Sequence, residues 1–372
     1  MRDVLPKLEE WWSKGEPVAL ATVVGTYSSA PRQPGASMLV GANGEAVGSV
    51  SGGCVEGAVY ELGQQVLADD RPVLQRYGVS DDDAFSVGLT CGGIIDIFVE
   101  KVTPEAFPEL GTVAEAVRNE EPIAVATVTS GPAERLGKRL IVRPDSVLGS
   151  TGSPRLDDAL RDDVRGLLDA GRNATLSYGV DGQRRGEGLT VFVESFAPPP
   201  RMIVFGAIDF AAAVAKIGNF LGYRVTVCDA RPVFATASRF PGANEVVVEW
   251  PHRYLKAEAE AGRIDGRTAL CVLTHDPKFD VPLLEVALRL PEVGYIGAMG
   301  SRRTHNDRIQ RLKERGITDE EIARMSSPIG LDLGARTPEE TAVSIAAEMI
   351  AKHWGGAGIR LAERDGPIHA AP

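Results

Sequence analysis

The sequence predicts an α/β protein in two parts: an N-terminal α/β domain with a diverged internal duplication, and a C-terminal doubly wound parallel sheet. Three observations carry this prediction. Short β-rich runs alternate with helical stretches along the 372 residues, two blocks of the first half resemble each other, and a strand–turn–helix–strand unit spans Met202–Asp229. We therefore expect domains at residues 1–197 and 201–355, a proline linker at 198–200, and a disordered tail at 356–372.

The first half reads as two related copies, at about residues 15–102 and 120–197. Strand-like runs at 18–25 and 94–99 flank a helix-like stretch from about 54 to 68, and further strands are expected at 123–129 and 189–195. The run PVALATV at Pro17 returns as PIAVATV at Pro122, and a shift of 101 positions carries Tyr77-Gly78-Val79 onto Tyr178-Gly179-Val180. The alternative is that two α/β segments share common residues by chance.

Two cysteine loops distinguish the first copy from the second. Ser51, Gly52 and Gly53 precede Cys54, and Cys91 lies in a second Gly-Cys segment, whereas the second copy has no cysteine at either place. A thiol at the start of a helix feels the positive end of the helix dipole, which favours the reactive thiolate. Cys54 and Cys91 are thus candidate catalytic thiols, and Glu56 either caps the helix or handles a proton. The alternative for each cysteine is an inert, buried side chain.

Composition excludes several classes of protein. The formal net charge of −11 argues against a nucleic-acid binder, whose binding face is basic. The polar N-terminus does not resemble a signal peptide, and no apolar run approaches the roughly 18 residues of a membrane span, so we expect a cytoplasmic protein without a membrane partner. The four cysteines are too far apart for a zinc or disulfide pattern and are expected to be thiols; joint metal ligation by Cys54 and Cys91 has little support because the first half has no histidine.

The second half begins with a βαβ unit of the Rossmann type. A strand at 202–205, a turn at Gly206, a helix at 209–221 and a strand at 224–228 lead to Asp229, where a ribose ligand is expected. The glycine fingerprint is incomplete, because Ile208 replaces the second glycine and Asp209 would repel an anion at the helix start. Ile208 therefore argues against NAD(P) as a ligand, although the fold is of the Rossmann type.

Other loops carry candidate ligand-binding groups. His275 and Asp276 follow one strand, as either a proton-transfer pair or a capped loop, and Gly300, Ser301, Arg302 and Arg303 follow another. A glycine turn followed by a serine and two arginines suits an anion, and the alternative is that these arginines are solvated surface. Arg32, in a hydroxyl-rich loop of the first copy, is a weaker candidate for the same role.

Several of these segments together resemble the XdhC/CoxI family of accessory proteins for molybdenum hydroxylases, over about residues 15–355. The matching segments are Ser28–Ala36, Gly48–Glu56, Cys91-Gly92-Gly93, Thr274-His275-Asp276, Gly300–Arg303, Ser327–Asp332 and Thr337–Glu340. The family has an intact glycine fingerprint and a histidine where Asp209 stands, so this chain departs from it at the turn.

The resemblance implies a protein that binds molybdenum cofactor (molybdopterin or its dinucleotide form), supports its sulfuration, and delivers it to a xanthine dehydrogenase- or CO dehydrogenase-type hydroxylase. It implies two partners, the molybdenum hydroxylase client and a cysteine desulfurase. We also expect a homodimer, because the dimer is the commonest form among symmetric oligomers of soluble proteins. On this hypothesis the metal end of the cofactor lies near Cys54 and its phosphates at Ser301–Arg303.

Two other functions remain open. The chain could be an NAD(P)-dependent oxidoreductase related to xanthine dehydrogenase, against which stand Ile208 and the absence of an iron–sulfur cysteine cluster. It could also be a non-catalytic docking scaffold, against which stand the two Gly-Cys loops. A maturation factor or cofactor chaperone is favoured over an independent oxidoreductase.

Overall fold

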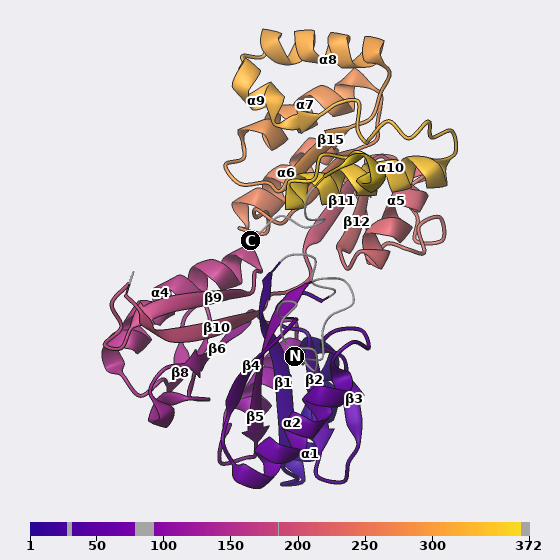
Figure 1. Ribbon diagram of the computed structural model, residues 1–372. Helices are drawn as coiled ribbons and strands as arrows, with labels where there is room; N and C mark the ends of the chain where they lie inside the picture. The colour runs from indigo at the N-terminus through magenta and orange to yellow at the C-terminus, as the bar shows by residue number, and fades with distance from the viewer. Residues whose placement is uncertain (28–31, 79–92, 185, 366–372) are drawn as a thin grey trace. The chain divides into compact units, whose positions relative to one another are not determined.

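The computed structural model describes residues 1–27, 32–78, 93–184 and 186–365. It divides into two compact units, Met1–Pro198 and Pro199–Arg364, each with its own sheets and cores. Figure 1 shows the α/β character of both units, as the sequence predicts. The predicted linker at 198–200 includes the point where the units divide.

The N-terminal unit contains two five-stranded antiparallel sheets with the same strand order (Figure 1). The first sheet is formed, in order, by β3 (Ala46–Gly48), β2 (Ser37–Gly41), β1 (Val18–Tyr27), β5 (Ile94–Val102) and β4 (Val73–Tyr77). The second is formed by β8 (Val147–Ser150), β7 (Arg139–Val142), β6 (Ile123–Ser130), β10 (Gly188–Phe196) and β9 (Ala174–Gly179). Duplication of one α/β unit would produce this arrangement.

Each sheet carries one long helix, and shorter elements complete the unit. The long helices are α2 (Glu56–Asp69) on the first sheet and α4 (Pro154–Ala170) on the second. The remaining elements are η1 (Arg2–Val4), α1 (Leu5–Ser13), α3 (Leu110–Arg118) and η2 (Ala133–Arg135). In β1, Ala19, Ala21 and Val23 contribute to the core with α2, while Val18 and Leu20 contribute to a core shared with β6, α1 and α3. The alternation of side chains along a strand thus buries both faces of the first sheet.

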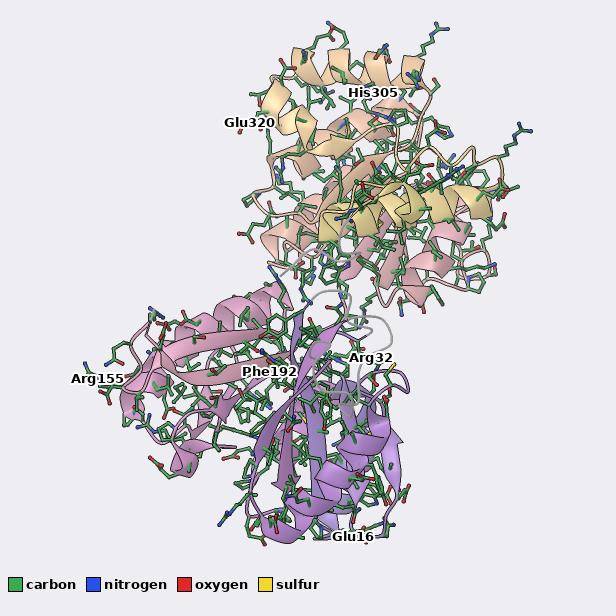
Figure 2. All side chains as sticks on the ribbon, viewed as in Figure 1. Glu16, Arg32, Arg155, Phe192, His305 and Glu320 are labelled. Atoms are coloured by element: carbon green, nitrogen blue, oxygen red, sulfur yellow. The ribbon has the colours of Figure 1, made fainter. Side chains whose placement is uncertain are left out.

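Buried charges lie between the two sheets of this unit. Glu100 of β5 forms an ion pair with Arg139 of β7, and both side chains are less than a tenth exposed. Glu194 of β10 lies 2.5 Å from the amino group of Met1. Phe192, labelled in Figure 2, contacts Val24 and Phe98 in a small cluster at the same seam. Each copy therefore contributes one buried glutamate to the contact between the copies.

The C-terminal unit contains one six-stranded sheet in which every pair of neighbouring strands is parallel, so the predicted Rossmann-like fold is confirmed. Its strands, in order, are β13 (Glu245–Val248), β12 (Arg224–Asp229), β11 (Arg201–Phe205), β14 (Ala269–Val272), β15 (Tyr295–Ala298) and β16 (Met325–Ser326). The order reverses direction between β11 and β14, which is the topological switch point where such sheets bind ligands.

Helices cover both faces of this sheet, as a doubly wound fold requires. One core contains residues of α5 (Asp209–Phe220) and α10 (Pro338–Trp354), which lie against each other in Figure 1. The other contains residues of α6 (Pro251–Glu260), α7 (Pro277–Arg289), α8 (Arg302–Glu314) and α9 (Asp319–Ala323). After α10, residues 356–365 of the predicted tail are exposed and include the short turn η3 (Leu361–Glu363).

Candidate functional site

The Cys54 loop connects β3 to α2 and depends on two glycines. Gly52 and Gly53 have φ values of 78° and 119°, a region that side-chain-bearing residues rarely adopt. A Cβ atom at either position would meet no other atom within 4 Å, so the backbone conformation, not crowding, requires glycine here. The loop is therefore sharply bent, and Cys54 lies two residues before α2 begins.

The carboxylate of Glu56 holds this loop together. It accepts hydrogen bonds from Ser49 Oγ (2.6 Å) and from the backbone amides of Ser51 (2.9 Å), Gly52 (3.0 Å) and Gly53 (2.8 Å). Partial burial raises the pKa of Glu56, but the hydrogen bonds from Ser49 and Ser51 outweigh it and lower the pKa to about 2. Glu56 is thus a capping carboxylate that stays ionised at neutral pH, which fits the capping alternative and leaves it no proton to donate.

Ser51 adds a second layer of capping around Cys54. Its side chain, 2% exposed as a residue, accepts hydrogen bonds from the amides of Cys54 and Val55, each at 3.0 Å. Cys54 itself is half-buried and packs at the edge of the core beneath α2. The amides on either side of the thiol are therefore fixed by the loop's own side chains.

The corresponding loop of the second copy has the cap without the thiol. Asp157, at the position of Glu56, accepts hydrogen bonds from Ser150 Oγ (2.6 Å) and the amide of Thr151 (2.9 Å). Arg155, labelled in Figure 2 near the start of α4, stands at the position of Cys54. The acidic cap therefore serves the fold in both copies, and the thiol is not needed for it.

A pH dependence follows from the shifted pKa of Glu56. A carboxylate with a lowered folded-state pKa stabilises the fold above its unfolded value of 4.5, and this contribution is lost as pH falls toward about 2. Because Glu56 is only partly buried, solvent screening limits the contribution to roughly 1–2 kcal/mol. Urea unfolding should show Glu56→Gln less stable than wild type at pH 5, with the difference shrinking toward pH 2. The exposed Glu61→Gln on the same helix is the control; an equal loss there would contradict the prediction.

The other described cysteines differ from Cys54. Cys228 and Cys271 are buried within strands of the C-terminal sheet. Burial raises the pKa of Cys228, and it raises that of Cys271 to about 12, so both are protonated thiols in the core. Cys54 is thus the partly exposed thiol among the described residues. Cys91 lies outside the described residues, and Arg32 pairs with Asp3 at 3.6 Å.

The turn after β11 is closely packed, and the acidic residue beside it, Asp229, is engaged within the protein. Gly206 has φ 111°, and a Cβ atom there would lie 2.8 Å from Thr274 Cγ2. Asp229, the predicted ribose ligand, accepts hydrogen bonds from the amide of Ala207 (2.7 Å) and from Arg231 Nε and Nη2 (2.9 and 2.8 Å). A ribose could bind Asp229 only if Arg231 moved away. Asp229 is therefore already paired with a neighbouring arginine of the same unit.

Asp276 and Ser301 are helix caps at neighbouring strand ends. Asp276 accepts a hydrogen bond from the amide of Lys278 (3.1 Å) at the start of α7, and Ser301 accepts one from the amide of Thr304 (3.1 Å) at the start of α8. Gly300 has φ 154°, and His275, Arg302 and Arg303 are exposed. The capping alternative describes Asp276, and the arginines remain available to a ligand.

A cavity of about 720 Å³ lies at the start of α8, and its walls include residues that sequence reasoning missed. Arg302, His305 and Asn306 form one side, and the segment Ser327–Asp332 forms the other. His305 and Asn306 lie on a strongly polar helix, where no sequence pattern marks them as site residues. The opposite wall, Ser327–Asp332, was marked only by the family resemblance. The cavity belongs wholly to the C-terminal unit.

Two further findings bear on the kind of protein. Within the described residues, no group of three or more histidine, cysteine, aspartate and glutamate side chains is arranged to hold a metal ion. In the same part of the chain, no helix combines the length and apolar character needed to cross a membrane.

The fold is that of a two-unit α/β protein in which a duplicated N-terminal unit precedes a Rossmann-like unit. The N-terminal unit carries the Cys54 loop. Comparison with known proteins agrees: a family model described as "XdhC and CoxI family" matches residues 11–78 and 116–179, and one described as "XdhC Rossmann domain" matches residues 202–349. A relative from Bacillus subtilis (strain 168), named as a probable subunit of xanthine dehydrogenase, is 30% identical over 90% of this chain and 93% of its own. The chain belongs to the XdhC and CoxI family.

Two other comparisons extend this result. The molybdenum cofactor insertion chaperone PaoD of Escherichia coli (strain K12) is 26% identical over 94% of this chain and 87% of its own. A crystal structure described as a xanthine dehydrogenase from Bacillus halodurans superposes with a TM-score of 0.66 at 23% identity, covering 97% of both chains. That likeness supports the fold.

Proposed function

We propose that this protein binds molybdenum cofactor, supports its sulfuration and delivers it to a xanthine dehydrogenase- or CO dehydrogenase-type hydroxylase. The observation that carries the proposal is the Cys54 loop, a partly exposed thiol beside a helix start that only one of two otherwise similar copies contains. The name of one relative, a molybdenum cofactor insertion chaperone, supports a role in handling this cofactor, and the name of another refers to xanthine dehydrogenase.

The chemistry of the loop fits such a cargo. Thiolate sulfur is a soft ligand that suits a metal–sulfur centre. Ser51 and Glu56 fix the backbone around Cys54, so the thiol would be presented in a preorganised position. Cys54 would hold the metal end of the cargo, and Cys91 would be a second candidate thiol.

The partners follow from the proposed role. The client is a molybdenum hydroxylase, and a cysteine desulfurase supplies the sulfur for cofactor sulfuration. A homodimer remains a prediction. Of the other functions, an NAD(P)-dependent oxidoreductase is disfavoured because Arg231 and Ala207 already occupy Asp229. A docking scaffold without cofactor is disfavoured because docking needs no partly exposed thiol.

The test is a binding titration of the purified protein with molybdenum cofactor. We expect wild type to bind with micromolar or tighter affinity and Cys54→Ala to bind about tenfold more weakly or worse, since one metal–ligand contact of roughly 1.4 kcal/mol or more is lost. Cys228→Ala, which removes a buried thiol, is the matched control and should bind as wild type does. Equal binding by Cys54→Ala, or a response to NAD(P)H without cofactor binding, would contradict the proposal.

A further inference from the structure

The open cavity at the start of α8 has a wall that hydrogen bonds of the C-terminal unit hold in place. Its volume of about 720 Å³ lies in the range typical of small-molecule sites. The segment Ser327–Asp332 is held from behind: the amide of Ile329 donates to Ala298 O (3.1 Å), and that of Gly330 donates to Glu348 Oε2 (2.8 Å). Ser344 Oγ donates to the carbonyl of Leu331. These three contacts anchor the segment that forms this wall.

A chain of polar contacts orients His305 in this cavity. Asp280 pairs with Arg308 at 2.9 Å, Arg308 Nη1 donates to Ser327 Oγ at 3.2 Å, and that oxygen lies 2.9 Å from His305 Nδ1. A hydroxyl that accepts from a guanidinium has its own hydrogen free for Nδ1. We assign the neutral ring with its hydrogen on Nε2, because burial and then the charge of Arg308 lower the pKa of His305. His305 thus offers a hydrogen-bond donor from a fixed ring.

The other side chains of the cavity complete a recognisable set. Arg302 supplies a guanidinium in the first turn of a 13-residue helix, the arrangement that binds phosphate. Asn306 offers an amide that both donates and accepts, and Ile329 and Leu331 offer apolar surface for a ring. Asp332, which also lines the cavity, can accept hydrogen bonds from hydroxyl groups. A nucleotide would use such a set: the guanidinium for its phosphate, the carboxylate for its sugar hydroxyls, and the amide and apolar surface for its base.

We propose that this cavity binds a nucleoside monophosphate unit, with its phosphate at Arg302 and His305 and its sugar hydroxyls at Asp332. One source of such a unit is the nucleotide half of a dinucleotide molybdenum cofactor, and for this source the inference rests on the proposed function. A free nucleotide is the other source. Ser327 is a positioning residue, since it acts through His305.

The first experiment titrates the full-length protein with the four common nucleoside monophosphates and with inorganic phosphate. We expect at least one nucleotide to bind more tightly than phosphate alone. Arg302→Ala and His305→Ala should each weaken it about tenfold or more, as expected for the loss of a charge-assisted or buried hydrogen bond. Arg311→Ala, which breaks an exposed pair on the same helix, is the matched control and should bind as wild type does. Nucleotide binding no tighter than phosphate, or unaffected by both cavity variants, overturns the proposal.

The role of Ser327 has a separate readout. In Ser327→Ala, the imidazole nitrogen resonances of His305 should lose the single Nε2–H tautomer, and nucleotide affinity should fall with it. Ser327→Thr, which keeps the hydroxyl, should restore both. An unchanged tautomer in Ser327→Ala overturns the positioning role.

Competition separates the two sources and the two proposals. A nucleotide that competes with dinucleotide cofactor but not with molybdopterin assigns the cavity to the cofactor's nucleotide half, whereas binding without competition assigns it to a free nucleotide; both support the cavity site. If cofactor binding depends on Cys54 while no nucleotide binds, only this inference fails. If nucleotides bind but cofactor does not, the proposed function fails and the cavity site stands.

Discussion

Arg308→Ala is expected to lower the free energy of unfolding of the C-terminal unit by roughly 3–5 kcal/mol, the usual cost of removing one partner of a buried ion pair. The Arg308 and Asp280 side chains are 2% and 4% exposed, and Arg308 also donates to the carbonyl of Met299 at 2.7 Å. Without Arg308 the buried Asp280 carboxylate loses its compensating charge. Burial already raises its pKa, so the variant should also protonate Asp280 more readily.

Hydrogen exchange of the amides of β14 and β15 in the full chain measures this loss without requiring both units to unfold together. Arg311→Ala, on the same helix but with an exposed partner, is expected to change stability by less than about 0.5 kcal/mol. Replacing both partners, Arg308→Met with Asp280→Leu, should recover part of the loss because no unpaired charge remains. A loss in Arg308→Ala no larger than in the control would count against this account.

Arg139→Ala is expected to have a similar effect on the N-terminal unit, again roughly 3–5 kcal/mol. Arg139 pairs with the buried Glu100, donates to the carbonyl of Gly137 at 2.9 Å, and lies with its guanidinium carbon 4.2 Å from the centre of the Phe107 ring. The change therefore removes a charge, a hydrogen bond and packing at the seam between the two sheets.

The matched control is Arg118→Ala, whose guanidinium pairs with Glu9 at 2.6 Å on the surface. An exposed pair contributes less than about 1 kcal/mol, so the two variants should differ clearly in hydrogen exchange of β5 and β6. If hydrogen-exchange protection falls equally in Arg139→Ala and Arg118→Ala, the prediction is wrong. Glu100 would then find another partner or become neutral at little cost.

The fold was predictable where the pattern of side chains is local. The runs around Val18 and Ile123 are strands as predicted, and the Met202–Asp229 segment forms the expected βαβ unit. The seam between the copies was not predictable. Glu100 and Arg139 are 39 positions apart, and a charged residue in a strand ordinarily indicates a solvent-facing side, so only the packing of two sheets shows that both are buried.

The candidate site shows the same division. Cys54 stood out because its glycines and thiol are missing from the second copy, a comparison that needs only the sequence. The ion pair between Asp229 and Arg231 could not be predicted from the sequence, because an arginine two residues after an aspartate can equally well point into solvent. His305 and Ser327 are 22 positions apart, and only the return of the chain beside α8 brings them within 2.9 Å. Sites built from one loop are readable in sequence, and sites built from two are not.

The cap on the Cys54 loop also determines what kind of chemistry the loop can select. Bent glycine loops at helix starts commonly recognise oxyanions through converging amide groups. Here the amides of Gly52 and Gly53 already point to Glu56, whose fixed negative charge would also repel an incoming phosphate. The amides of Gly52 and Gly53 are therefore already used within the loop and are not offered to an oxyanion. On the proposed function, recognition at this loop would then depend on the Cys54 side chain and not on the backbone amides of Gly52 and Gly53.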